Sequence, residues 1–577
     1  METDESIDQL RTDLLKAQIT LSNINLLQAS KWCAEAINGL SNASNITQIP
    51  TLEFDPYDLQ DYSRFILAKS YFDVKEFDRC AHSLVGCKSG NAVFLKLYSK
   101  ILSLDKKMAE ENDGSVNLFH VPDEADPNQN NHRTQGNIIG GQANSKDLNS
   151  KLSKIIQEIE SFNSSSNPNH FLYYLLGIIY NKKRNYKLAQ RNLLAALKLF
   201  PYNWSCWQEL INSIIDFDEA MELLNKVKSS KSSLNPSIMF NFFEVVLLQE
   251  FYQQSVDVNQ TLEKLLSIFP NFNFLKIQKF LICYHSLDYY QAESIFDQIL
   301  EDDPLRIDDL DTYSNMLYVM EKKSKLSFLA QYSSNIDKFK PETCCIIANY
   351  HSMKGEHEKA IMYYKRALIL NKNSLSAWTL MGHEFVELKN SHAAIESYRR
   401  AVDINPKDFR AWYGLGQAYE VLDMHLYSLY YYQRATNLQP TDKRMWQAIG
   451  NCYEKIGKFD ESLKSFKKAL SIDNTNKPQE SHGSYDPYIC YKLASIYEKI
   501  ASVKECYKYM KLCFDQELDW GITDETSKAR LWLARYALEL KKYEEAYELT
   551  KDLNHNNAHD IEEARAIARE ARNRMNK

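Results

Sequence analysis

The chain has little of the positive charge that nucleic-acid-binding proteins concentrate on one face. Its 577 residues carry 69 Lys and Arg against 76 Asp and Glu, a formal net charge of −7, and no block of the sequence is strongly basic. We therefore expect no nucleic-acid partner. No run approaches the ~18 consecutive apolar residues that a membrane-spanning helix needs, so we expect no membrane partner either. The opening residues, Met1–Ser6, are acidic and polar, and we expect neither a signal peptide nor a transit peptide there.

The motifs that carry common active sites are also missing. There is no Cys-x2-Cys pair, no His-Glu-x-x-His, no P-loop, no Gly-x-Ser-x-Gly and no Rossmann glycine run. The eleven cysteines are odd in number and lack a framework spacing, which predicts a reducing compartment. Most of them, including Cys80, Cys344, Cys506 and Cys513, fall where the repeat described next needs a small buried residue. We predict no catalytic residue, no metal site and no cofactor.

Three tryptophans stand 34 residues apart, Trp378, Trp412 and Trp446, and each opens the same pattern. The pattern continues with Met381, Gly382, Phe385, Ala394, Tyr398, Ala401 and Pro406, then with Leu415, Gly416, Tyr419, Ser428, Tyr432, Ala435 and Pro440, then with Ile449, Gly450, Tyr453, Ser462, Phe466 and Ala469. This spacing is that of the tetratricopeptide repeat, a hairpin of helices A and B. The small residues let the two helices approach closely, and the proline ends helix B. The sequence therefore predicts an all-α fold, a right-handed superhelix of stacked hairpins.

The period can be followed in both directions, which gives about a dozen repeats. A good earlier match begins at Tyr173, and the pattern resumes at Cys490 and Arg530. The segment over 106–150 is poor in aromatics and cannot bury enough apolar surface to offset chain entropy. We predict an N-terminal repeat-like block that dimerises (1–105), a disordered linker (106–150), a main array (151–474), an insertion (475–486), and C-terminal repeats with a capping helix (487–577).

One position of the repeat carries a row of polar side chains. Helix A lines the concave surface of such a solenoid, and we expect its ninth residue to point into the groove and to face solvent in the free protein. Two repeats carry Leu247 and Leu281 there, and the next five carry Asn315, Asn349, His383, Gln417 and Asn451. Amides both donate and accept hydrogen bonds, so the row predicts binding of an extended peptide, with Tyr413 and Glu387 at neighbouring groove positions. The alternative is that these are ordinary solvated residues.

Four tyrosines lie close together in one B helix, Tyr427 and Tyr430 to Tyr432. Tyr432 is a core position of the repeat, whereas Tyr430 and Tyr431 are expected on or near the outer surface. Exposed aromatic residues in a row can mark a subunit interface. The alternative is that they pack between adjacent B helices.

Several segments are unusual for a tetratricopeptide repeat and resemble one family closely. They are Lys340–Tyr350, Ala377–Leu388, Gly414–Tyr419 with Leu422–Tyr431, and Thr523–Ala534. Together they resemble the subunit-eight family, also called cell division cycle protein twenty-three, of the anaphase-promoting complex. The resemblance covers nearly the whole chain and weakens over 106–150. The Asn-rich linkers and the chain length suggest a fungal member.

The resemblance implies a non-catalytic scaffold of a ubiquitin ligase that acts on cell-cycle proteins, in the nucleus and cytoplasm. It implies homodimerisation through the N-terminal repeats, contacts with other subunits of the complex, and a groove for the C-box, a short basic motif of the activator. Acidic Glu384, Glu387 and Glu420 would suit its arginines. The alternative is a co-chaperone or other peptide-binding adaptor. A co-chaperone clamp needs lysine at the fifth position of helix A, which here reads Cys345, Thr379, Tyr413 and Gln447.

Overall fold

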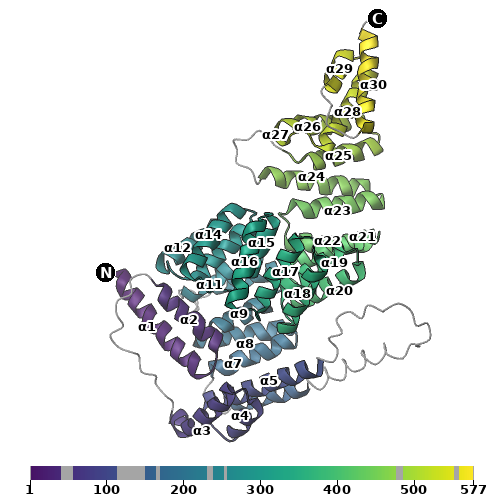
Figure 1. The fold of residues 1–577 in the computed structure, drawn as a ribbon. Helices are drawn as coiled ribbons and strands as arrows, with labels where there is room; N and C mark the ends of the chain where they lie inside the picture. Colours follow the sequence, from purple (N-terminus) through teal and green to yellow (C-terminus); the bar gives the residue numbers. More distant parts are fainter. Residues whose placement is uncertain are drawn as a thin grey trace, which may run out of the picture. The chain divides into compact units, whose positions relative to one another are not determined.

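The structure is a computed structural model (Figure 1) that describes residues 2–40, 56–112, 150–163, 169–229, 238–252, 256–475, 485–551 and 558–575. All regular secondary structure in these ranges is α-helical, as the repeat pattern predicts. The chain forms two compact units, Met1–Arg306 (unit 1) and Ile307–Lys577 (unit 2). Most of the predicted linker (113–149) and of the predicted insertion (476–484) lies outside the described residues. The start of that linker, over 106–112, belongs to a helix.

Unit 1 consists of successive helical hairpins and a further helix over 150–163. Its helices are α1 (Glu2–Asn23), α2 (Leu27–Gly39), α3 (Pro56–Asp73), α4 (Phe77–Ser83), α5 (Gly90–Asn112), α7 (His170–Lys182), α8 (Tyr186–Leu199), α9 (Trp204–Ser213), α10 (Phe217–Ser229), α11 (Ile238–Glu250), α12 (Val256–Ile268), α13 (Asn273–His285) and α14 (Tyr289–Asp302).

The N-terminal hairpin α1–α2 packs against helices that come much later in the sequence of unit 1. Trp32 of α2 stacks on Trp204 of α9 with ring centroids 4.9 Å apart, and it meets Phe272 edge-on at 5.4 Å. Gly39 is so close to Phe272 that an added Cβ would lie 2.6 Å from the Cβ of that residue. One hydrophobic core joins α1 and α2 to helices as late as α13. The hairpin α1–α2 and one side of α5 therefore share a core with later repeats of unit 1, whereas α3, α4 and the rest of α5 form a smaller core.

Unit 2 continues the series of hairpins and ends in a single helix. Its helices are α15 (Leu310–Val319), α16 (Lys323–Ile336), α17 (Pro341–Met353), α18 (His357–Leu370), α19 (Leu375–Glu387), α20 (Ser391–Ile404), α21 (Phe409–Val421), α22 (His425–Leu438), α23 (Lys443–Ile456), α24 (Phe459–Thr475), α25 (Pro487–Lys499), α26 (Val503–Asp515), α27 (Glu517–Trp520), α28 (Asp524–Glu539), α29 (Tyr543–Lys551) and α30 (Ala558–Met575).

Each A helix of unit 2 ends at one residue in the left-handed conformation, which turns the chain into the B helix. A single left-handed residue after the last helical turn lets backbone N–H groups bond the final carbonyls and stops the helix. The turn residues are Glu321, Gly355, Lys389, Asp423, Gly457, Ala501 and Lys541, with φ between 56° and 88°. The hairpin shape thus comes from the same local turn in every repeat.

Close approach of helices A and B depends on the glycine of the repeat. A Cβ added at Gly382 would lie 2.6 Å from the ring of Tyr398, and one at Gly416 would lie 2.4 Å from the ring of Tyr432. Real side chains do not approach so closely, and the two tyrosines are almost fully buried. The prediction that a small residue is required at this position is confirmed.

The repeat tryptophan also has a polar role that the sequence pattern does not reveal. Its indole Nε1–H donates to the backbone carbonyl of the residue six positions earlier, in the turn before helix A. The pairs are Trp207 with Pro201 (2.8 Å), Trp378 with Lys372 (3.0 Å), Trp412 with Pro406 (2.9 Å) and Trp446 with Pro440 (2.9 Å). The tryptophan therefore fixes the turn between repeats as well as filling space.

The charged C-terminal run forms the last helix of unit 2. On α30, Ala564, Ile567 and Ala571 are buried, whereas Arg565 and Arg569 are exposed. Figure 1 shows α30 beside α28 and α29 (yellow). One face of α30 thus packs on the last hairpin while the other meets solvent, as expected for the cap of a repeat array.

Candidate functional site on the A helices of unit 2

The predicted row of polar residues lies on five successive A helices of unit 2. Asn315, Asn349, His383, Gln417 and Asn451 belong to α15, α17, α19, α21 and α23, at the same position of each 34-residue repeat. We call these five residues the ninth-position row. The structure brings the five A helices together in order but gives the five side chains different surroundings.

Asn349 is buried within the repeat array. Its side chain is 2% exposed, its Nδ2 donates to the Ser314 hydroxyl at 2.7 Å, and its Oδ1 accepts from the Tyr364 hydroxyl. Ser314 comes from the preceding A helix and Tyr364 from the B helix of the same repeat. The expectation that the whole row faces solvent is therefore wrong for Asn349, because neighbouring helices already occupy its hydrogen-bonding groups.

His383 is bonded in a similar way. Its Nδ1 lies 2.8 Å from the hydroxyl of Tyr398, which occupies the position that Tyr364 has one repeat earlier. Burial, and then the nearby Arg410 guanidinium, lower the pKa of His383 to about 4. The imidazole is consequently neutral at physiological pH, with one ring nitrogen committed to the tyrosine. It can offer a hydrogen bond to a ligand but no positive charge.

The remaining members of the row are partly buried and closer to solvent. Gln417 is hydrogen-bonded to Tyr413, and burial raises the pKa of that phenol. The Oδ1 of Asn451 accepts from the Tyr488 hydroxyl at 3.1 Å, which leaves its amide N–H groups for other partners. Asn315, at the other end of the row, is also partly exposed. These positions are the ones at which a peptide backbone could find donors and acceptors.

The three acidic residues next to the row differ in how much charge they present. Glu384 is 5% exposed and accepts from the Ser352 hydroxyl at 2.6 Å and from His357 Nδ1 at 2.8 Å. It therefore ties three helices together and is not available to an arginine of a ligand. This network was not predicted, because its partners come from separate helices, and no sequence pattern links the three residues.

Glu387 and Glu420 remain nearer the surface. Glu387 is exposed, and no residue in the described ranges pairs with it. Glu420 accepts from the Tyr432 hydroxyl at 2.8 Å and lies 3.5 Å from the Lys455 ammonium. Of the three carboxylates, Glu387 is thus the one with an uncommitted negative charge for a basic ligand.

The tyrosines of α22 divide between packing and exposure. Tyr431 is partly buried and stacks on Tyr419 at 5.2 Å and on Trp412 at 6.0 Å. Tyr430 is 49% exposed and meets Tyr431 edge-on at 5.3 Å, with Tyr427 exposed nearby. Tyr431 is therefore mainly a packing residue within the α21–α22 hairpin, and Tyr430 is the part of the pair that a partner subunit could contact.

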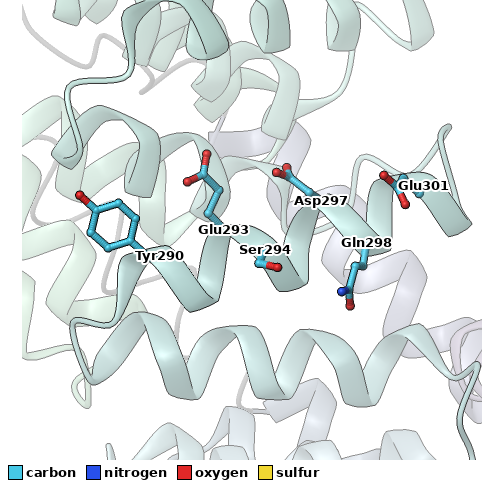
Figure 2. A pocket seen from close by; sticks show the side chains of 6 residues that line it. All are labelled: Tyr290, Glu293, Ser294, Asp297, Gln298 and Glu301. Atoms are coloured by element: carbon cyan, nitrogen blue, oxygen red, sulfur yellow. The ribbon is translucent and has the colours of Figure 1, made fainter.

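A surface cavity of about 430 Å³ lies on unit 1 and is separate from the row. Figure 2 shows its lining, which comes entirely from α14 and carries the carboxylates of Glu293, Asp297 and Glu301. None of its residues belongs to the predicted site. An acidic stripe on one helix is most often a solvated face, and we assign it no role.

The described residues offer few other groups for metal binding or catalysis. No group of three or more His, Cys, Asp or Glu side chains there could hold a metal ion. All eleven cysteines are buried and none forms a disulfide in the described residues, and burial raises the pKa of the Cys33 thiol to about 12. None of the described helices is long and apolar enough to cross a membrane.

Known families match most of the chain. Residues 9–280 match the family described as anaphase promoting complex subunit 8 / Cdc23. Residues 341–374, 382–422 and 444–476 match tetratricopeptide-repeat families. The two kinds of match fall on different parts of the chain, with residues 281–340 between them, and the repeat matches include all of the row except Asn315.

Related proteins cover the chain more fully. The anaphase-promoting complex subunit CDC23 of Saccharomyces cerevisiae is 43% identical over 629 residues, which span 99% of both chains. Anaphase-promoting complex subunit 8 of Arabidopsis thaliana is 32% identical over 66% of each chain. Among solved structures, one chain in the crystal structure of the APC/C hetero-tetramer Cut9–Hcn1 aligns with a TM-score of 0.55 and 16% identity, over 88% of this chain and 89% of that one. This last similarity concerns the fold alone.

The stacked hairpins and their repeat signature define a tetratricopeptide-repeat protein. Because the similarity to the yeast subunit extends over nearly the whole chain, the chain belongs to the subunit 8 / Cdc23 family of the anaphase-promoting complex.

Proposed function

We propose that the chain is a non-catalytic scaffold subunit of the anaphase-promoting complex, the E3 ubiquitin ligase that acts on cell-cycle proteins, in the nucleus and cytoplasm. The observation that carries this proposal is the 43% identity to the yeast subunit along 99% of both chains. Repeat solenoids present long surfaces to other proteins, which suits a subunit that holds several neighbours. Binding to other subunits of the complex follows from the same proposal.

The finer proposal is that the A helices of unit 2 bind the basic C-box segment of the activator. Support comes from the exposed part of the row, Gln417 and Asn451, and from the unpaired carboxylate of Glu387 beside it. Partly exposed amides can bond an extended backbone, and an uncommitted carboxylate can pair with arginine. The buried hydrogen bonds of Asn349 and Glu384 fix the relative positions of the helices that form this surface.

The test is a titration of a fluorescently labelled C-box peptide against the full chain. Loss of one hydrogen bond and one charge-assisted bond should each cost about 1–2 kcal/mol. Gln417→Ala combined with Glu387→Ala should therefore weaken binding by at least about tenfold, at 1.4 kcal/mol per decade. Glu387→Lys should be worse than Glu387→Ala, because it adds repulsion to a basic ligand.

A matched control is Asp403→Ala, which removes an exposed carboxylate from the B helix α20 and should leave the affinity unchanged. Thermal melts of all variants would show that each remains folded. Wild-type affinity in the double variant would place the C-box elsewhere, with the surface around Tyr430 as the next candidate.

We also propose that unit 1 mediates homodimerisation. Helix α3 packs on α4 and α5, yet it leaves Tyr62, Ile66 and Leu67 between 45% and 48% exposed. A row of apolar side chains on one helix face is a typical element of a self-complementary interface.

Light scattering of the full chain at micromolar concentration should give a dimer. Ile66→Glu with Leu67→Ser should give a monomer whose helical content is unchanged, because both side chains are exposed in the single chain. A monomeric wild-type chain would contradict the proposal, and a dimer that persists in the variant would move the interface away from α3.

The residues at the fifth position of helix A argue against the alternative function, a co-chaperone adaptor. A co-chaperone clamp needs lysines there, whereas Cys345 and Thr379 are 1% and 5% exposed. Buried small residues at this position cannot hold the carboxylate of a peptide C-terminus.

A further inference from the structure

One contact recurs between successive repeats near the C-terminal end of unit 2. A polar side chain on each B helix reaches the tyrosine on the next A helix that stands seven residues after the tryptophan position. The pairs are Arg399 donating to the Tyr419 hydroxyl at 2.7 Å, Gln433 donating to the Tyr453 hydroxyl at 3.1 Å, and Lys467, whose Nζ lies 5.5 Å from the ring centroid of Tyr497. The tyrosine thus fills the space between two B helices and meets a polar group at its hydroxyl end.

At the junction with the last hairpin the polar side chain is present, but the tyrosine is missing. Helix α26 carries Lys511 at the equivalent B position, whereas α28 carries Ala537 where the tyrosine stands in the three earlier repeats. Arg530 replaces the tryptophan of the same repeat. A cavity of about 380 Å³ remains here, lined by α26, α28 and α29. We call this cavity the tyrosine slot.

The walls of the tyrosine slot suit an aromatic ring. Leu533, Leu540 and Leu549 contribute apolar surface, and Tyr507 and Tyr536 stand at the edge with ring centroids 5.4 Å apart. A volume of this size falls in the range of small-molecule binding pockets. Charged side chains line the slot as well, among them Lys511, Asp515 and the buried Arg530. The slot therefore offers an apolar surface for a ring and polar groups for its hydroxyl.

Neighbouring side chains do not take the place of the missing ring. The guanidinium of Arg530 donates to the Leu549 carbonyl at 2.6 Å and to Glu517 at 3.1 Å, and is 9% exposed. It is thus held at the wall. Lys511 is exposed, and no residue in the described part of the chain pairs with it. A hydroxyl placed over Ala537 would restore the contact that the earlier repeats make internally.

We propose that the tyrosine slot binds a tyrosine side chain of a partner peptide, with the phenol ring over Ala537 and its hydroxyl directed to Lys511. The occupant is identified by the chemistry of the three filled positions, where the chain itself supplies a phenol next to the equivalent polar side chain of the preceding B helix. Tyrosine combines a large apolar face with one polar end and is a frequent anchor at protein interfaces. This site is separate from the ninth-position row and does not depend on the binding of a C-box.

The experiment measures binding of N-acetyl-L-tyrosinamide to the full chain by saturation-transfer NMR, with the phenylalanine and alanine amides for comparison. The tyrosine amide should bind best, the phenylalanine amide roughly two- to tenfold more weakly for want of one hydrogen bond, and the alanine amide not at all. Lys511→Ala should remove the preference for tyrosine over phenylalanine without removing binding.

Two reciprocal variants locate the site. Ala537→Tyr restores the repeat pattern and should fill the slot from within, so that the probe no longer binds while the melting temperature is kept or raised. Tyr497→Ala should open a second slot beside Lys467 and increase the number of probe molecules bound. Ala537→Leu is a smaller filling that should also block the probe, in case the tyrosine variant folds poorly.

The proposal fails if folded Ala537→Tyr or Ala537→Leu binds the probe like the wild type. It also fails if the wild-type chain self-associates through this surface, which would appear as concentration-dependent light scattering that Ala537→Tyr abolishes. That result would assign the slot to a second copy of the chain.

Discussion

Replacing Gly382 with alanine sets helix propensity against packing, and the structure indicates which prevails. Alanine in a helix interior is favoured over glycine by about 1 kcal/mol, so an exposed substitution would stabilise the protein. At Gly382 the new Cβ would lie 2.6 Å from the Tyr398 ring, which is fully buried. Gly414 approaches the same ring, at 2.5 Å from an added Cβ. The ring is held between two glycines and has no room to move away.

Overpacking of this kind costs about 1–3 kcal/mol or more, and the lack of room places this site at the upper end. After the gain in helix propensity, we expect a net destabilisation on the order of 1–2 kcal/mol. For a unit of this size the melting temperature should fall by roughly 3–6 °C. Differential scanning calorimetry of the full chain measures this shift, and the exposed Asp403→Ala serves as the neutral control.

A second substitution tests whether the ring is the cause. In a Tyr398→Leu background the ring is absent, so Gly382→Ala should be neutral or stabilising, and the two changes should depart clearly from additivity. An increase in melting temperature for Gly382→Ala alone would refute the packing argument and the alignment of the repeat on which it rests.

Two further predictions concern the ninth-position row. Asn349→Ala should destabilise unit 2 by about 1–3 kcal/mol, because it removes the bond to the Ser314 hydroxyl and leaves the buried Tyr364 hydroxyl without its acceptor. Gln417→Ala, measured in the same thermal melts, should change stability by less than about 0.5 kcal/mol, and equal effects would contradict the burial described. His383 has a folded pKa of about 4, below its ordinary 6.5, so its contribution is complete above about pH 6.5 and is lost as the pH falls towards 4. The loss is up to roughly 3 kcal/mol, at 1.36 kcal/mol per pKa unit. The difference in stability between the wild type and His383→Gln should therefore shrink over that window, and a constant difference would exclude the titration.

The repeat made much of unit 2 predictable because each of its contacts is local. Gly382 and Tyr398 lie on the two helices of a single hairpin. A glycine paired with an aromatic residue recurs every 34 residues, so the pattern itself specifies the contact. The A helices and the positions of the row could be predicted for the same reason.

The environment of each row residue was not predictable from the period. Asn349 and Gln417 occupy equivalent positions, yet only Asn349 is enclosed, because Ser314 of the preceding repeat bonds to it. The position of a residue in the repeat predicts which way its side chain points from the helix. How much of that side chain is exposed depends on the side chains that surround it. The same limit applies to Glu384, whose partners come from two other helices.

The 34-residue period does not predict the packing of α2 against α9. No repeat relates Trp32 to Trp204, and the stacked pair joins residues 172 positions apart. Contacts of this kind leave no spacing in the sequence, and only the three-dimensional structure shows them.

The hairpin α1–α2 must wait during synthesis for native neighbours that come much later in the sequence of unit 1. Trp32 packs against Phe272, so 240 further residues must be synthesised before that surface exists. At about 5–20 residues per second the interval is roughly 10–50 s. Later hairpins can close on their predecessor within a few seconds, since their contacts are local. A nascent chain therefore carries an unpaired hairpin with an exposed tryptophan through most of the synthesis of unit 1, and chaperones that shield apolar segments have their longest opportunity at this end of the molecule.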